Sequence, residues 1–152
     1  MHLYLMRHGQ AKAAEEDPER GLTVQGWYDT RKIAGWLAGK HLHISCIYHS
    51  TKLRAQQTAI LVADTIGATR ALSSHENLSP NDPVGPWKTL LENETRTVMV
   101  VGHLPFLGKL VSLLVDGSEE SDTVQFPSSG IVCLSRIDAV WNIEWETGPG
   151  QV

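Results

Sequence analysis

The sequence predicts an α/β fold with three layers, in which a central, mainly parallel sheet carries helices on both faces. Short apolar runs of strand length alternate with longer segments of helical period along most of the chain. The connections between these segments are short, which favours parallel strands linked by helical crossovers. Two alternating runs near the C-terminus, joined by a short turn, predict a β-hairpin that completes the sheet.

The expected strands lie at residues 3–6, 44–49, 70–73, 97–101, 131–136 and 141–146. The run at 97–101 is rich in β-branched residues, which pack well in a buried sheet. The turn at 137–140 joins the last two strands. Trp141 and Trp145 are four residues apart on the last strand, so regular alternation places them on the same face of the sheet.

The expected helices lie at residues 23–37, 53–66, 84–91 and 105–115. The segment 53–66 has the clearest apolar face, and Gly67 is its expected C-cap. Pro105 fits the first turn of a helix, where its missing N–H costs nothing. Residues 11–19 and 116–122 are expected to be surface loops, and residues 148–152 a frayed tail.

The length of 152 residues predicts a single domain that spans residues 1–152. Thirteen Lys and Arg residues against seventeen Asp and Glu residues give a net charge of -4. This balance argues against a nucleic-acid-binding protein driven by its overall charge, although it leaves room for a small cationic pocket. Cys46 and Cys133 lie in apolar segments and are expected to be buried thiols. Apolar runs too short for a bilayer and the lack of a signal peptide predict a cytoplasmic protein without membrane contacts.

Four polar residues follow predicted strands. Arg7 and His8 end the first strand, Arg54 follows the second, and His103 follows the strand at 97–101. The carboxyl ends of parallel strands meet at one crevice, so these side chains are expected in one pocket. Arginine offers a fork of donors suited to phosphate oxygens, and histidine can attack phosphorus as a neutral imidazole. The pattern therefore predicts a phosphate-binding site.

Each of these residues, taken alone, is more often a structural or solvated side chain than a functional one. Gly9 and Gly102 stand beside the two histidines, and glycine lets a backbone come close to a ligand. This combination favours a ligand site over the structural alternative. The remaining histidines have no such neighbours in sequence: His2, His41, His43, His49 and His75. Of these, His41 and His43 are expected at the surface rather than on a metal ion.

The motifs around these residues resemble the histidine phosphatase superfamily, whose fold is phosphoglycerate-mutase-like. Its Arg-His-Gly signature is similar to Leu5-Met6-Arg7-His8-Gly9-Gln10, and its Leu-Thr-x-x-Gly motif to Leu22-Thr23-x-x-Gly26. Two further signatures resemble Ser50-x-x-x-Arg54-Ala55-x-Gln57-Thr58-Ala59 and Val101-Gly102-His103-Leu104-Pro105. Within the superfamily, the sequence most resembles the small SixA-type phosphohistidine phosphatases. Three segments carry this resemblance: Asp17-x-x-Arg20, Leu78-Ser79-Pro80 and Phe126-Pro127-Ser128-Ser129-Gly130.

The resemblance implies a phosphatase in which His8 attacks phosphorus and a phospho-histidine intermediate is then hydrolysed by water. Arg7, Arg54 and a protonated His103 would bind the phosphoryl oxygens. Gly9 and Arg20 are expected to contact the substrate, although Arg20 could equally be a solvated loop charge. Backbone N–H groups in the turn at residue 105 are also expected to face the anion. The resemblance implies no metal and no cofactor.

The proton donor of the family's esterases and mutases has no convincing counterpart. Glu76 and Asp82 are the nearest candidates, and both fit turn residues better. An alkoxide leaves badly without a proton, whereas a phosphohistidine P–N bond is weaker. Residues 74–95 also leave no room for a large lid, so the expected substrate is a phosphohistidine-bearing protein. A small-molecule phosphomonoesterase and a non-catalytic phosphate-binding module are the alternatives, and the oligomeric state is not predicted.

Overall fold

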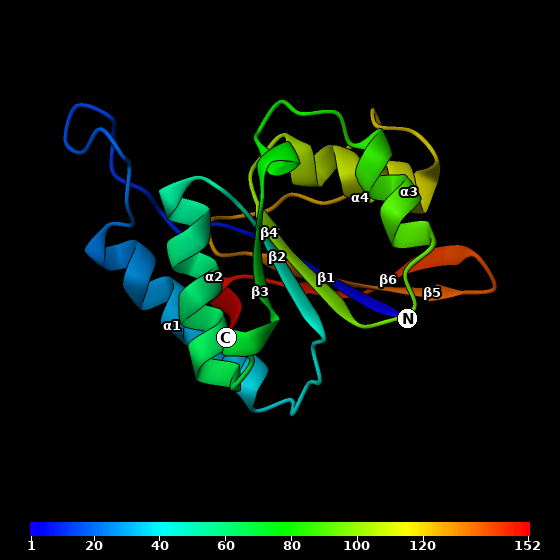
Figure 1. Cartoon of the computed structure of the whole chain (residues 1–152), viewed down its shortest axis with the longest axis horizontal. Coiled ribbons are helices and arrows are strands. Elements are labelled where there is room, and N and C mark those ends of the chain that lie inside the picture. Colours follow the sequence, from blue (N-terminus) through cyan, green and yellow to red (C-terminus); the bar gives the residue numbers. More distant parts are fainter.

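The computed structural model describes residues 1–152 and contains a six-stranded sheet of order β3-β2-β4-β1-β5-β6 (Figure 1). The four strands β1 to β4 run parallel, and β5 pairs antiparallel with β1 and with β6. The strands are β1 (His2–Arg7), β2 (Cys46–Ser50), β3 (Leu72–His75), β4 (Val98–Gly102), β5 (Ile131–Ile137) and β6 (Val140–Thr147). The expected mainly parallel sheet and its C-terminal hairpin are therefore confirmed.

Helices cover both faces of this sheet, as predicted (Figure 1). The helices α1 (Val24–Ala38) and α2 (Leu53–Ile66) lie on one face, and α3 (Gly85–Glu92) and α4 (Phe106–Asp116) lie on the other. The strand β3 begins two residues later than expected because a short 3-10 turn, η1 (Thr69–Ala71), precedes it. None of the helices is both long enough and apolar enough to cross a membrane.

The strand β1 shows why its sequence is apolar throughout. Leu3 and Leu5 are buried in the core under α3 and α4, whereas Tyr4 and Met6 are buried in the core under α1 and α2. A central strand with helices over both faces has no solvent side, so its side chains do not alternate in polarity. This burial fixes β1 firmly and gives its last residue, Arg7, a defined position.

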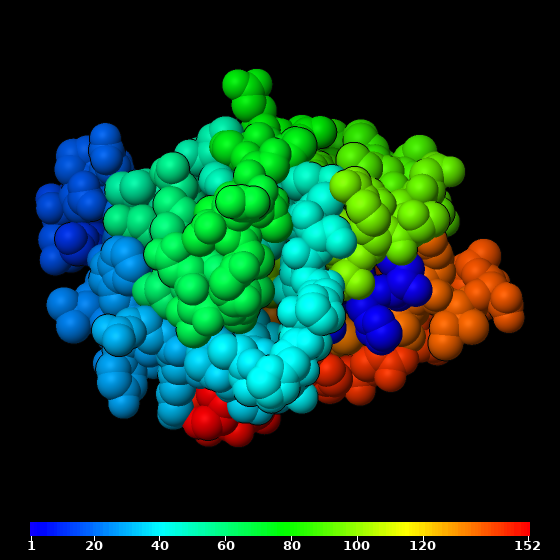
Figure 2. All heavy atoms as spheres, turned by 60° about the horizontal axis from the view of Figure 1, so that its bottom comes forward, coloured from blue at the N-terminus to red at the C-terminus, as the bar shows by residue number.

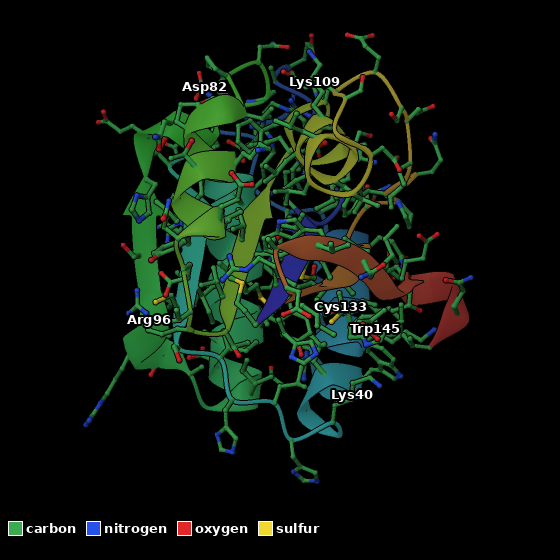
Figure 3. The ribbon with its side chains drawn as sticks, turned by 90° about the vertical axis from the view of Figure 1, so that its right-hand side faces the viewer. Lys40, Asp82, Arg96, Lys109, Cys133 and Trp145 are labelled. Atoms are coloured by element: carbon green, nitrogen blue, oxygen red, sulfur yellow. The ribbon has the colours of Figure 1, made fainter.

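The last strand contradicts one expectation. Cys133 pairs with Trp145 but Leu134 pairs with Ile143, so one extra residue, Glu144, bulges out of β6. A bulge shifts the alternation of side chains by one. Trp141 therefore joins the core under α3 and α4, while Trp145 packs on the opposite side with Lys40 over its ring (Figure 3). The prediction that the two tryptophans share a face was wrong.

The C-terminal residues are ordered rather than frayed. They form a 3-10 turn, η3 (Pro149–Gln151), and the Pro149 carbonyl accepts a hydrogen bond of 2.9 Å from Lys32 Nζ on α1. Val152 packs against the core under α1 and α2. The prediction of a frayed tail was therefore wrong, because a terminus that is packed and hydrogen-bonded is ordered.

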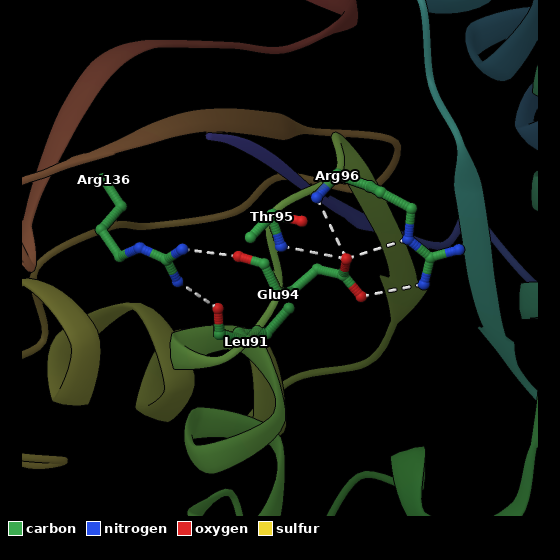
Figure 4. Close-up of polar contacts among 5 residues, drawn as sticks. All are labelled: Leu91, Glu94, Thr95, Arg96 and Arg136. Carbon is green, nitrogen blue, oxygen red and sulfur yellow. Dashed lines mark hydrogen bonds and ion pairs between the residues drawn. The ribbon is translucent and has the colours of Figure 1, made fainter.

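The connection between α3 and β4 is fixed by arginine side chains (Figure 4). Arg136 on β5 donates hydrogen bonds of 2.5 Å to the Leu91 and Glu94 carbonyls. The Glu94 carboxylate accepts from Arg96, and this hydrogen bond lowers the pKa of Glu94 to about 2. The start of β4 is thus anchored at the amino-terminal end of the sheet, where Arg96 lies in Figure 3.

The largest cavity, of about 770 Å³, opens at this same amino-terminal end. It is lined by the segment before β2 and by the end of α2, which lie side by side in Figure 2. His41 and His43 line it and are exposed, as the sequence predicted. No residue at the carboxyl ends of β1, β2 or β4 lines this cavity, so it is separate from the predicted site.

Gly26 in α1 gives a stability prediction for the loop that follows β1. A Cβ at this position would lie 2.2 Å from the Gln10 carbonyl oxygen, whereas a Cβ at Gly35 in the same helix meets nothing within 4 Å. We expect Gly26→Ala to lower the free energy of unfolding by about 2–3 kcal/mol, because backbone must move. Gly35→Ala should raise it by about 0.5–1 kcal/mol through helix propensity. Urea unfolding of both variants measures the pair, and equal effects would contradict this packing.

Candidate functional site

The sheet register brings the predicted residues from three strands to one place. Arg7 at the end of β1 is paired with Gly102 at the end of β4, and His49 in β2 is paired with Val101. The residues that follow these pairs, His8 and His103, therefore lie next to each other. Their ring centroids are 5.0 Å apart. The expectation of two histidines at one crevice is met by this geometry.

Arginines surround the two imidazoles. Arg54 lies in the first turn of α2 and, with Arg20 and Lys52, lines a cavity of about 610 Å³. Arg20 has a left-handed backbone (φ 52°), and its Nε donates to the Lys12 carbonyl at 3.0 Å. Burial is the main cause of the lowered pKa values of His8, His103 and Arg54, and the charge of Arg20 acts in the same direction. Arg20 thus belongs to the same cationic group and is not an isolated loop charge.

The His8 imidazole is held in one orientation. Its Nδ1 lies 2.7 Å from the Gly9 carbonyl oxygen, which can only accept, so Nδ1 carries the proton and Nε2 keeps its lone pair. Burial lowers the pKa of His8 to about 4, and the charges of Arg54, Arg7 and Arg20 act in the same direction. At neutral pH this side chain is therefore an uncharged imidazole with a free nucleophilic nitrogen.

Gly9 is engaged inside the protein rather than open to a ligand. Its N–H donates to Thr58 Oγ1 at 3.0 Å, and this hydroxyl donates to the Arg54 carbonyl at 2.8 Å. A Cβ on Gly9 would lie 2.7 Å from Thr30 Oγ1. The Gly9 N–H therefore links the loop of His8 to the helix of Arg54 and is not free to donate to a ligand. Sequence reasoning assigned no role to Thr58, although its spacing of four from Arg54 places both on one face of α2.

His103 is almost fully buried, at 1% exposure. Its Nε2 lies 2.8 Å from Ser50 Oγ, while its Nδ1 has no hydrogen-bond partner. Burial lowers the pKa of His103 to about 3, and the charges of His8, Arg54, Lys52 and Arg20 lower it further. The unliganded pocket therefore holds an uncharged His103. The protonated form that the resemblance implies refers to the phosphate-bound state and stays a prediction.

Two other expectations about this end of the sheet are modified. The helix α4 begins at Phe106 with Pro105 as its N-cap, and the Leu107 N–H donates to the His103 carbonyl at 2.9 Å. The Leu107 amide therefore closes the turn and does not face an anion. Arg7 Nη1 donates to the Phe126 carbonyl at 2.9 Å, and its buried Nε has no partner. Arg7 thus keeps donor capacity for a ligand while its guanidinium is fixed.

The two acidic candidates do not join the cationic group through any hydrogen bond. Asp82 lies on the loop at the carboxyl-terminal end of the sheet (Figure 3), and its Oδ2 accepts from the Ser79 N–H at 2.8 Å. Glu76 is exposed at the start of η2 (Glu76–Leu78). Asp82 thus has the turn role that the sequence favoured. No three His, Cys, Asp or Glu side chains lie close enough together to hold a metal ion.

The lowered pKa of His8 predicts an acid-sensitive fold. Below pH 6.5 the unfolded chain binds a proton at this histidine, whereas the folded protein does so only near pH 4. Stability from this group is therefore complete above about pH 6.5 and is lost as the pH falls toward 4. We expect a loss of about 2 kcal/mol between pH 7 and pH 5.

Urea unfolding at several pH values measures this loss. His8→Asn should reduce the pH dependence without abolishing it, because His103, whose pKa is lowered to about 3, contributes in the same pH range. His41→Asn, at an exposed histidine, is the control. Asparagine tolerates the left-handed backbone of His41 (φ 54°), so this control adds no strain. An unchanged slope in His8→Asn would show that His8 is not buried as an uncharged group.

Comparison with known proteins places these features in a family. Residues 3–96 match the model of the histidine phosphatase superfamily (branch 1). The phosphohistidine phosphatase SixA of Escherichia coli (strain K12) is 31% identical, over 98% of this chain and 94% of the relative. The phosphohistidine phosphatase SixA homolog of Haemophilus influenzae is 28% identical, over 75% of this chain and 77% of the relative. The solved structure of the protein histidine phosphatase SixA complexed with tungstate superposes with a TM-score of 0.88, at 30% identity, over 99% of this chain and 98% of that one.

Proposed function

Since the chain belongs to branch 1 of the histidine phosphatase superfamily, we propose that it removes phosphoryl groups from phosphohistidine on a protein. The state of His8 carries this proposal. The His8 Nδ1–H donates a hydrogen bond to the Gly9 carbonyl, and burial lowers the pKa of the imidazole. Nε2 is therefore an unprotonated nucleophile at neutral pH. A phosphatase that works through a phospho-histidine intermediate needs this form of histidine before the substrate arrives.

The reaction takes place in two displacements. In the first, His8 Nε2 attacks phosphorus while the bond between phosphorus and the substrate's imidazole breaks, and that imidazole takes up a proton from water. In the second, water attacks the phosphoryl group on His8 and returns one proton to the solvent, which yields inorganic phosphate and restores the free imidazole. Each step replaces one bond to phosphorus by another, so no further reactant is required.

The cationic group around His8 supports both displacements. The guanidinium groups of Arg7 and Arg54 are forks of donors that match the oxygens of a phosphoryl group, where negative charge gathers in the transition state. His103 adds a ring nitrogen beside His8, and Arg20 adds charge at the cavity that Arg54 lines. Because these groups are already in place, little reorganisation is needed as charge develops.

The positions of the two acidic residues favour a substrate with a phosphorus–nitrogen bond over a phosphate ester. The Asp82 carboxylate accepts a hydrogen bond from the Ser79 N–H in its own turn, and Glu76 is exposed. An alcohol requires a proton as it leaves, whereas the imidazole of a phosphohistidine is a far better leaving group. The relative from Escherichia coli carries the name phosphohistidine phosphatase, which supports the same choice. A protein fits as the partner because residues 74–95 form only η2 and the short helix α3, not a lid.

A substrate panel tests the proposal. It compares a phosphohistidine-bearing protein, an aryl phosphate whose phenol leaves without a proton, and an alkyl phosphate. We expect kcat/KM to fall in that order, and Glu76→Gln and Asp82→Asn to leave all three rates unchanged. Efficient alkyl phosphate hydrolysis that is lost in Glu76→Gln would instead identify a phosphomonoesterase. Binding of phosphate without any turnover would identify a binding module.

A further inference from the structure

Ser50 is a fully buried residue to which the proposed reaction assigns no role. It is the last residue of β2, and its Oγ lies 2.8 Å from Nε2 of His103. The same Oγ accepts a hydrogen bond of 3.2 Å from the Lys52 N–H. Neighbouring parallel strands create this contact, since β2 and β4 pair one residue before Ser50 and end side by side. The contact is therefore part of the sheet and not of a flexible loop.

The hydrogens around Ser50 can be arranged in two ways. A hydroxyl has one proton and two lone pairs, and the Lys52 N–H uses one lone pair. If Nε2 of His103 carried the proton, Ser50 would accept twice and its own O–H would be buried without an acceptor. If Ser50 donates to Nε2, its O–H is satisfied and the imidazole proton lies on Nδ1. The second arrangement avoids an unsatisfied buried hydroxyl, which costs about 1–3 kcal/mol.

In this arrangement Nδ1 of His103 carries the imidazole proton and can donate a hydrogen bond to a ligand. It is buried and has no partner in the protein, while the His8 ring that would carry the phosphoryl group lies beside it. A phosphoryl oxygen is an acceptor, so only a protonated Nδ1 can bind it. We propose that Ser50 holds His103 as an uncharged Nδ1–H donor to the phosphoryl group on His8; this inference rests on the proposed function. Ser50 is then a positioning residue, because it acts through His103.

The charged surroundings of His103 agree with an uncharged donor. His8 faces it from the end of β1, Arg54 and Lys52 from the start of α2, and Arg20 from the loop before α1. The charges of Arg54, Lys52 and Arg20 oppose a positive charge on His103, the neighbouring His8 is itself uncharged at neutral pH, and no carboxylate is among these groups. A hydroxyl that fixes the tautomer provides a donor without a further cation.

Nitrogen-15 NMR of the free protein tests the tautomer directly, without reference to turnover. We expect the His103 signals to show a protonated Nδ1 and an unprotonated Nε2 between pH 5 and pH 8, and to keep this form with inorganic phosphate bound. Ser50→Ala should shift the population toward the Nε2–H form. A His103 with its proton on Nε2 in the wild type, or an imidazolium in the phosphate complex, would overturn the inference.

Kinetics separate a positioning role from a merely structural one. Ser50→Ala should lower kcat by about 10- to 100-fold at pH 8, less than the loss expected for removing the donor itself in His103→Ala. Ser50→Thr, which keeps the hydroxyl, should restore most of this rate together with the Nδ1–H tautomer. Ser112→Ala, at a buried serine in α4, is the matched control and should behave as the wild type. A Ser50→Thr variant that keeps the Nδ1–H tautomer but is as slow as Ser50→Ala would contradict the inference.

The two proposals fail in different ways. If no phosphohistidine protein is dephosphorylated but NMR shows the Nδ1–H tautomer and its dependence on Ser50, the proposed substrate is wrong and the positioning role stands. If turnover is found but the His103 tautomer does not depend on Ser50, the function stands and the positioning role is wrong.

Discussion

Replacement of His8 by alanine is expected to reduce turnover of a phosphohistidine protein by at least about 10⁴-fold. The nucleophilic Nε2 is lost, and the other imidazole of the pocket, His103, has its Nε2 occupied by Ser50. Steady-state release of phosphate measures the effect. No other side chain in the pocket offers a free, uncharged nucleophile, so the remaining activity should approach the uncatalysed rate.

The control for this variant is its affinity for inorganic phosphate. Arg7 and Arg54 remain in place in His8→Ala, so a phosphate ion should still bind, as titration calorimetry can show. A variant that neither turns over nor binds phosphate has lost its pocket. A variant that retains substantial turnover would contradict the role of His8.

Replacement of Arg54 by alanine is expected to lower kcat by about 10²- to 10³-fold. Arg54 lines the cavity beside Arg20, and Thr58 donates to its carbonyl, so the backbone from which its side chain projects is held in place. Arg54→Lys should restore only part of the rate, since an ammonium cannot form the paired contacts of a planar fork. Single-turnover rates at saturating substrate measure the loss in the chemical step.

Arg70→Ala is the matched control for Arg54→Ala. Arg70 is an exposed arginine that lines the cavity at the opposite, amino-terminal end of the sheet. Its removal changes the net charge by the same amount but leaves the pocket intact, so activity should be unchanged. Equal losses in both variants would mean that overall charge, rather than a local contact, explains the effect.

Much of this fold could be predicted because burial in two layers leaves a clear pattern. The uninterrupted apolar run of β4 and the amphipathic pattern of α2 both follow from a sheet covered on both faces. The bulge at Glu144 could not be predicted, since one inserted residue leaves no mark in composition. It reversed the face of Trp145, which alternation alone had placed beside Trp141.

The position of the site was predictable for a topological reason. Strand ends of a parallel sheet converge, so residues that follow strands, such as His8 and His103, meet whatever the details of the loops. The protonation state of His103 was not predictable, because it depends on burial and on charges from distant segments. The roles of Gly9 and Ser50 also depend on hydrogen bonds between strands and helices, which the order of residues does not reveal.

The covalent step at His8 is the centre of the proposed mechanism. Its direct test mixes the protein with a phosphohistidine protein labelled with phosphorus-32, quenches within milliseconds under alkaline conditions and locates the label by mass spectrometry. The predicted result is a transient phosphoryl group on His8, attached at Nε2, that decays as inorganic phosphate appears. Release of phosphate at full rate with no label on His8 would contradict the mechanism.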